Sequence, residues 1–282
     1  MSSSPESAER WFHPLISRAE PRLTRRRLFL LSSSGLALAA GARPDLKLVA
    51  AQTPSSTPAA PSALIQDQVT GDDDAVALLR DAAAAMAALD SFRFEIETVR
   101  GESSVFQGLS VDLIEGAVRR PYDFIATVTV GLPIGTLDVT AVGLDGLAWV
   151  EDPLNDGAWI ALEGGEDLVA LVNPDTLILS SIGLIQDASI DGTEQVDGQE
   201  TTVVAGLVDF AEAASQLSGG SVSLPAEVSA EPHPVLVWID GERRVLEIEV
   251  AGPILTSESS DVVRAIRFFE FNEPVDIERP DV

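Results

Sequence analysis

The sequence of 282 residues contains no cysteine. Disulfide bonds, thiolate metal sites and cysteine nucleophiles are therefore excluded, as is attachment of a lipid to an N-terminal cysteine. Histidine is also scarce, because only His233 occurs beyond His13. A multi-histidine zinc site is thereby ruled out, and no serine elbow, phosphate-binding loop or metal-ligand spacing is present. The sequence predicts a protein without a cofactor, a metal or catalytic residues.

Positive charge is scarce beyond residue 51. Lys47 is the only lysine, and residues 52–282 carry 10 arginines against 41 aspartates and glutamates. The whole chain has a formal net charge of −27 at pH 7. Such a surface repels a polyanion, so we expect no binding to nucleic acid. Mutual repulsion between copies also favours a soluble monomer.

The basic residues gather instead near the N-terminus, in front of an apolar run. Arg26, Arg27, Phe29 and Leu30 match the Arg-Arg-x-Phe-Leu core of a twin-arginine export signal. The apolar run over residues 28–42 contains three serines and two glycines and is shorter than the roughly 20 residues that span a bilayer. This order of charge and hydrophobicity predicts an exported protein.

Three segments follow from these patterns. Small residues at 40–42 and 49–51 are typical of cleavage sites, so we predict a twin-arginine-type signal region over residues 1–51. Residues 52–71 form a Ser/Thr/Pro/Ala-rich linker, and residues 72–282 form one domain. We expect the protein outside the cytoplasm, in the cell envelope, the periplasm or the medium. An uncleaved signal acting as a membrane anchor is the alternative.

Hydrophobic periodicity predicts one clear helix and many strands. The alanine-rich segment 75–89 has an apolar stripe at helical spacing, and Asp72, Asp73 and Asp74 before it are typical of a solvated N-terminus rather than a metal site. From residue 91 the period changes to two, with phenylalanines on one face and charges on the other. This alternation predicts strands at 91–100, 111–118, 122–130, 136–143, 147–151, 158–162, 187–195, 200–208, 235–240, 244–251 and 261–271.

Two more helical regions interrupt the strands. The apolar stretch 166–185 is broken at Asn173-Pro174 and predicts two short helices that lie against an apolar surface. A further short helix is predicted at 210–217. One helix, many antiparallel strands, a helical insertion and more strands together predict an α+β domain with a large curved sheet and helices on one face.

The order and spacing of six segments resemble the LppX/LprA/LprF/LprG lipoprotein family, which shares the fold of the lipoprotein carrier LolA. The resemblance covers roughly residues 74–271. The segments are Ala88–Ser91, Gly146–Trp149, Leu171–Pro174, Glu194–Thr201, Pro234–Asp240 and Arg244–Leu246.

The resemblance implies a half-open β-barrel whose concave face is covered by helices, with an apolar cavity between the two. It also implies non-catalytic binding of lipids or acylated glycolipids and their transport across the cell envelope, with transient membrane contact. Many relatives carry a cysteine through which they are lipid-anchored, and this sequence has none. A free shuttle, or one anchored by its signal, is therefore expected.

The apolar faces of the predicted strands and helices are the candidate lining of this cavity. They comprise Leu79, Met86, Phe92, Phe94, Ile96, Phe124, Val128, Leu137, Val139, Leu168, Leu171, Leu177, Leu179, Ile182, Leu184, Phe269 and Phe271. Ordinary core packing is the favoured explanation for any single one of them, so the hypothesis concerns the whole set. Candidate head-group ligands are the arginine pairs Arg119, Arg120, Arg243 and Arg244.

Two other classes remain open at this point. An envelope module that buries a protein segment instead of lipid would need a similar apolar face. A hydrolase using a pair of carboxylates is conceivable because acids are plentiful, but no spacing in the sequence selects such a pair.

Overall fold

The computed structural model describes residues 68–103, 110–121, 123–132, 135–153, 155, 157–161, 182–217, 229, 231–254 and 258–281. All of them belong to one unit that spans Pro61–Val282. The predicted signal region and most of the linker lie outside the described residues. So do the predicted central helices, apart from their last four residues, 182–185.

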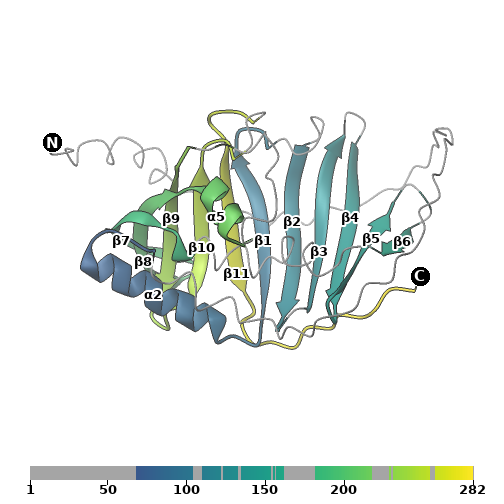
Figure 1. Ribbon diagram of the computed structural model, residues 1–282, viewed down its shortest axis with the longest axis horizontal. Coiled ribbons are helices and arrows are strands. Elements are labelled where there is room, and N and C mark those ends of the chain that lie inside the picture. Colours follow the sequence, from purple (N-terminus) through teal and green to yellow (C-terminus); the bar gives the residue numbers. More distant parts are fainter. Residues whose placement is uncertain are drawn as a thin grey trace, which may run out of the picture. The chain divides into compact units, whose positions relative to one another are not determined.

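Within the described residues, eleven strands form one antiparallel sheet in the order β6-β5-β4-β3-β2-β1-β11-β10-β9-β8-β7 (Figure 1). The first strand therefore pairs with the last at the centre of the sheet, and no pairing joins the edge strands β6 and β7 among these residues. The strands are β1 (Ser91–Arg100), β2 (Ser110–Arg119), β3 (Asp123–Leu132), β4 (Gly135–Leu144), β5 (Leu147–Asp152), β6 (Ala158–Ala161), β7 (Gln186–Val196), β8 (Gln199–Val208), β9 (His233–Asp240), β10 (Val245–Ala251) and β11 (Val263–Phe269).

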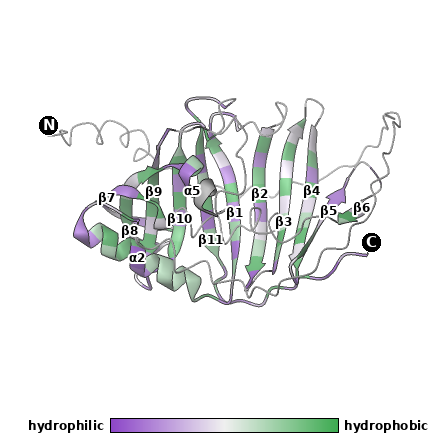
Figure 2. Cartoon of the chain, viewed as in Figure 1, coloured by the Kyte–Doolittle hydropathy of each residue, from purple (hydrophilic) through white to green (hydrophobic). Residues whose placement is uncertain are grey.

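Alternation along the strands defines two faces, which are visible as alternating colours in Figure 2. We call the face that carries Phe92 and Phe94 the inner face, and the face that carries Arg93 and Glu95 the outer face. Two tight turns hold the register of the outer hairpins. Asp145-Gly146 joins β4 to β5, Asp197-Gly198 joins β7 to β8, and all four residues have positive φ, as a type I′ turn requires.

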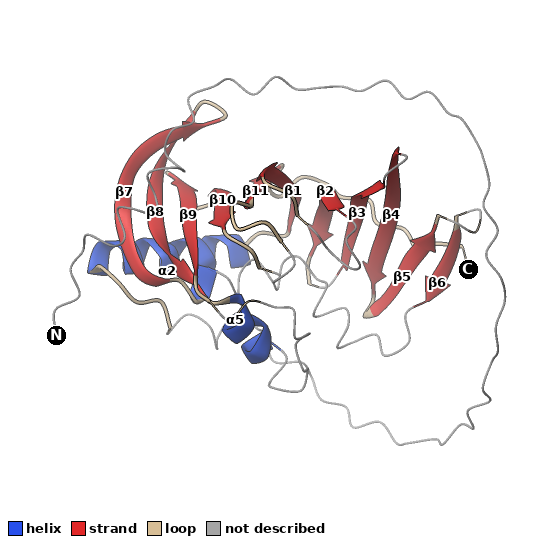
Figure 3. Cartoon of the chain, turned by 90° about the horizontal axis from the view of Figure 1, so that it is seen from above, coloured by secondary structure: helices blue, strands red, loops and turns tan. Residues whose placement is uncertain are grey.

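Helix α2 (Asp73–Ala87) covers the inner face of β7 to β11. Asp72 occupies the N-cap position in an extended conformation, and its carbonyl accepts the first helical bond from the amide of Val76. The apolar stripe predicted from the sequence is buried, with Leu79 and Met86 fully inaccessible to solvent. Figure 1 and the view from above in Figure 3 both show α2 running across β7, β8 and β9. The second described helix, α5 (Phe210–Leu217), has the bounds expected from the sequence.

The C-terminal segment crosses the outer face of β1 to β5 as an extended strap. Its amide at Asn272 donates to the carbonyl of Ser91 at 2.8 Å, and Val275 and Ile277 pack with Trp149 in a small apolar cluster. The guanidinium of Arg279 lies 5.1 Å from the centre of the Trp149 ring. The sequence patterns predict no element for this segment, because an isolated extended strap has no period of its own.

Candidate functional site

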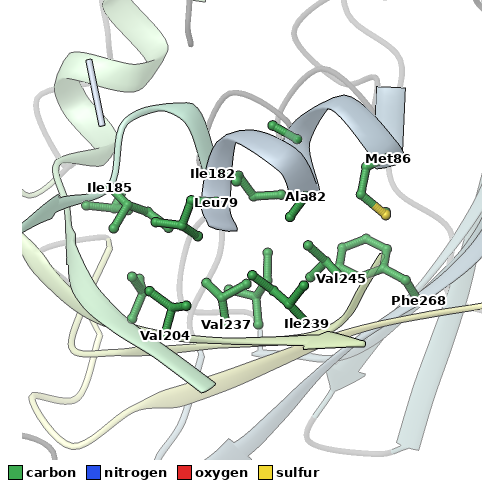
Figure 4. Packing of buried hydrophobic residues seen from close by; sticks show 14 of the residues in the cluster. Leu79, Ala82, Met86, Ile182, Ile185, Val204, Val237, Ile239, Val245 and Phe268 are labelled. Atoms are coloured by element: carbon green, nitrogen blue, oxygen red, sulfur yellow. The ribbon is translucent and has the colours of Figure 1, made fainter. Parts of the chain in front are cut away.

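The inner face has two parts that differ in packing. Under α2 the side chains fill the space between helix and sheet: Leu79 and Met86 point toward Val237, Ile239 and other strand residues (Figure 4). The candidates Leu79, Met86, Phe92, Phe94, Phe124, Ile182 and Leu184 are all buried at 4% exposure or less. In this part of the inner face the apolar residues form a packed hydrophobic core.

An apolar row crosses seven strands of the inner face. Register pairs each member with the next across β9, β10, β11, β1, β2, β3 and β4. The row consists of Val237, Ile248, Ile266, Ile96, Ile114, Val128 and Val139.

Coverage of the apolar row changes along its length. Val237 and Ile248 are buried, but from Ile266 to Val139 the side chains are only half-buried. Leu137 extends the same face one pair further along β4, opposite Val130, and is also half-buried. A contiguous apolar surface on β11 and β1 to β4 therefore stays partly accessible.

Glycines beside the row accommodate aromatic rings from the neighbouring strand. A Cβ at Gly116 would lie 2.8 Å from Cζ of Phe94, and one at Gly143 would overlap the ring of Phe124. The two phenylalanines thus lie over the backbone of the adjacent strand, and Ala126 and Ala141 next to them are small.

The structure places the two C-terminal phenylalanines of the predicted lining, Phe269 and Phe271, in different surroundings. Phe268 pairs with Phe94 on the inner face, so Phe269, opposite Arg93, lies on the outer face and is 40% exposed. Phe269 is therefore on the face opposite to the predicted lining, because the register of β11 turns Phe268 inward instead. Phe271 packs against the core beyond the end of β11, with the guanidinium of Arg244 4.9 Å from its ring centre. Leu168, Leu171, Leu177 and Leu179 lie outside the described residues.

The four candidate head-group arginines all have partners within the protein. Arg119 lies on the outer face and binds Asp123 with an Nη2 to Oδ2 distance of 2.9 Å. Arg120 donates to the carbonyl of Leu89. Nε of Arg243 lies 3.9 Å from Oδ2 of Asp81, and Nη2 of Arg244 lies 2.7 Å from Oδ2 of Asp240. Each contact fastens a strand end or turn near α2, and none of these arginines lies beside the half-buried part of the row.

A polar cluster that the sequence patterns did not single out lies on the inner face of β9 to β11. It is at the end of these strands opposite to Arg243 and Arg244. Arg264 Nη2 binds the carboxylate of Glu258 and donates to the hydroxyl of Ser103 at 3.1 Å. His233 is buried, and its ring centre lies 5.6 Å from that of Phe210 at the start of α5. Burial lowers the pKa of His233, against the opposing effect of a hydrogen bond to the backbone of Ala251. The only sequence signal was that His233 is a lone histidine between two prolines.

Two further features bear on the classes considered from the sequence. In the described ranges, no three His, Asp or Glu side chains come together in a way that could hold a metal ion. Among the same residues, no helix has both the length and the apolar character needed to cross a bilayer.

The profile of the LppX_LprAFG lipoprotein family matches residues 74–277. The chain belongs to this family. The lipoarabinomannan carrier protein LprG of Mycobacterium tuberculosis (strain H37Rv) is 29% identical over 171 residues, which are 59% of this chain and 66% of that protein. LprG of Mycobacterium bovis (strain AF2122/97) matches to the same extent, so the chain spans just under two thirds of the length of these relatives.

The crystal structure of LprF shows the same fold. The crystal structure of LprF from Mycobacterium bovis superposes with a TM-score of 0.51 at 14% identity and covers 75% of this chain and 99% of that one. The crystal structure of LppX from Mycobacterium tuberculosis superposes with a TM-score of 0.48 at 21% identity and covers 73% of this chain and 100% of that one. The LolA-like architecture expected from the sequence, an open antiparallel sheet with few helices, is confirmed.

Proposed function

We propose that this protein binds lipids or acylated glycolipids without catalysis and carries them across the cell envelope, with acyl chains lying along the half-buried part of the apolar row. The observation that carries the proposal is the change in coverage along this row, from fully buried Val237 to half-buried Ile96, Ile114, Val128 and Val139. The name of LprG as a lipoarabinomannan carrier supports the same class of ligand.

The energetics suit reversible binding. Burying an acyl chain is worth about 0.8 kcal/mol per methylene relative to water. A lipid in a bilayer is already sheltered from water, so only the difference between two apolar environments remains. A preformed apolar surface of β-branched side chains adds little ordering cost to this balance, because those side chains are already stiff. Uptake and release then both stay feasible.

Organic extraction of the purified protein followed by mass spectrometry tests the proposal. We expect lipid at close to one molecule per chain, and uptake of a fluorescent fatty acid by the delipidated protein. Val128→Gln places an amide on the inner face and should weaken this uptake at least several-fold. Thr127→Gln, the neighbouring position on the outer face, is the matched control and should leave uptake unchanged.

A clean extract together with no uptake by the unchanged protein contradicts the proposal. Retention of a peptide in place of lipid would identify the protein-binding module considered from the sequence.

Export by the twin-arginine route and a monomeric, extracytoplasmic protein are part of the same proposal. The basic and apolar pattern of residues 1–51 supports the route, and the net charge of −27 supports the monomer. Replacing Arg26 and Arg27 together by lysine should keep the protein in the cytoplasm. N-terminal sequencing of exported protein distinguishes a cleaved signal from a retained anchor, and light scattering gives the mass in solution.

A further inference from the structure

The polar cluster beside the apolar row contains two buried nitrogen atoms whose hydrogen-bonding capacity is unused. Within the described residues, Nη1 of Arg264 and Nε2 of His233 are inaccessible to solvent and make no hydrogen bond. Buried polar atoms of this kind are costly unless something pairs with them, so each such atom calls for an explanation.

Register places both side chains on the inner face. Val235, Val250 and Arg264 are directly opposite one another on β9, β10 and β11, and His233 is two residues before Val235 on the same face. Arg264 is also two residues from Ile266, a member of the apolar row. The distance between the two positions along β11 is about 7 Å. A head group attached to chains that lie along the row would therefore reach Arg264.

The two free atoms have complementary roles. Arginine has only donors, so Nη1 of Arg264 needs an acceptor. Burial lowers the pKa of His233 and so favours its neutral form. Because Nε2 makes no hydrogen bond, the bond to the backbone of Ala251 is assigned to Nδ1, which then carries the proton. Nε2 is then an acceptor and needs a donor. A hydroxyl group can satisfy either atom, because it both accepts and donates a hydrogen bond.

Charge argues against an anionic occupant. The side chain of Arg264 is 13% exposed, and its charge is already neutralised by the carboxylate of Glu258, which is 2% exposed. Asp209 and Glu231 are the other carboxylates that act on His233, and both add negative potential. A phosphate here would leave a buried excess of negative charge, which is unfavourable.

The third orphaned nitrogen of the described residues has a different explanation. Nη2 of Arg267 lies on the outer face, 3.7 Å from a carboxylate oxygen of Glu97, while its other nitrogens face Glu95 and Glu247. It belongs to an ion-pair network on the face opposite to the apolar row, where the acyl chain is proposed to lie. Arg267 therefore serves as a matched control on the same strand.

We propose that Arg264 and His233 each hydrogen-bond a hydroxyl group of the carried lipid, so that the protein selects lipids with an uncharged, hydroxyl-bearing head group. This inference rests on the proposed function, and it names the class of head group and the two residues that recognise it.

Competition for a bound fluorescent fatty acid tests the site, with three single-chain lipids as probes: 1-monooleoylglycerol, methyl oleate and 1-oleoyl-lysophosphatidate. We expect the unchanged protein to bind monooleoylglycerol about tenfold more tightly than methyl oleate, as one or two buried hydrogen bonds would give. His233→Leu and Arg264→Lys should each reduce this preference to about twofold or less. Arg264→Lys keeps the charge opposite Glu258 but loses the second donor arm.

The controls separate recognition from folding. Methyl oleate should bind equally well to all variants, Arg267→Lys should keep the full preference, and His233→Gln, which retains an acceptor oxygen, should keep part of it. Equal binding of the two neutral lipids by the unchanged protein overturns the site and means that water fills it. Tighter binding of lysophosphatidate overturns the uncharged class. If the unchanged protein binds none of the three, the proposed function itself fails.

Discussion

Phe124 in β3 lies over Gly143 in β4, so that no side chain larger than hydrogen fits at position 143 without displacing the ring. We expect Gly143→Ala to lower the free energy of unfolding by about 1–3 kcal/mol, the usual cost of overpacking. Urea denaturation measures this, with Gly241→Ala, where an added Cβ meets nothing, as the control. Adding Phe124→Leu should recover part of the loss. If the double variant is no better than the sum of the two single ones, the proposed contact is not the cause.

Leu79 and Val128 should respond differently to truncation. Leu79 is fully buried under α2, so Leu79→Ala should cost about 2–5 kcal/mol of unfolding free energy. Val128 is half-buried, so Val128→Ala should cost less than about 1.5 kcal/mol in the delipidated protein. Chemical denaturation of delipidated samples provides both values. Equal costs at the two positions would show that the half-buried part of the row is packed as tightly as the core under α2.

The fluorescence of Trp149 should report whether the C-terminal strap stays packed on the outer face. Ile277 is buried against this tryptophan and neighbouring apolar residues, so Ile277→Ala should cost about 2–3 kcal/mol and shift part of the tryptophan emission to longer wavelength. Asp276→Ala, at the exposed position beside it, should change neither property. An unchanged emission spectrum and midpoint in Ile277→Ala would mean that the strap does not hold its place in solution.

His233 should make stability depend on pH below neutrality. Burial lowers the pKa of His233 in the folded protein below 6.5, its ordinary value in the unfolded chain, with a smaller contribution from Arg264 and opposing effects of the Ala251 backbone, Asp209 and Glu231. Between these two pKa values the unfolded chain binds more protons. The unfolding free energy should therefore fall as pH drops below about 6.5 and be unaffected above it.

Comparison with His233→Gln isolates this contribution from the many carboxylates. The difference in unfolding free energy between the two proteins should change between pH 7 and pH 5, in favour of the variant at the acidic end. A constant difference over that range would show that His233 titrates alike in both states.

The sequence was sufficient for features that depend on near neighbours. Alternation assigned Phe92 and Phe94 to one face, and Asp-Gly pairs located the hairpins, because a period of two and positive φ are local properties. Pairing between distant strands was not available from such patterns. A bulge between Val111 and Leu113 shifts the face of Ile114, and the register of β11 decides that Phe268, and not Phe269, lies inside.

The candidate site shows the same division. Apolar members of the row could be proposed from alternation, whereas the meeting of Arg264, Glu258 and Ser103 depends on pairing across more than 150 residues. The C-terminal strap could not be predicted, because its few apolar residues follow no helical period and are too few to define a strand.

The pairing of β1 with β11 has a consequence for how the molecule is made. Arg93 and Phe269 are partners at the middle of the sheet, although nearly the whole domain separates them in the chain. As the ribosome proceeds, β1 to β6 and then β7 to β10 emerge with an open central edge, and contacts of such long range form slowly. The two halves can join only after β11 has emerged, so the centre of this sheet is the last part to be paired.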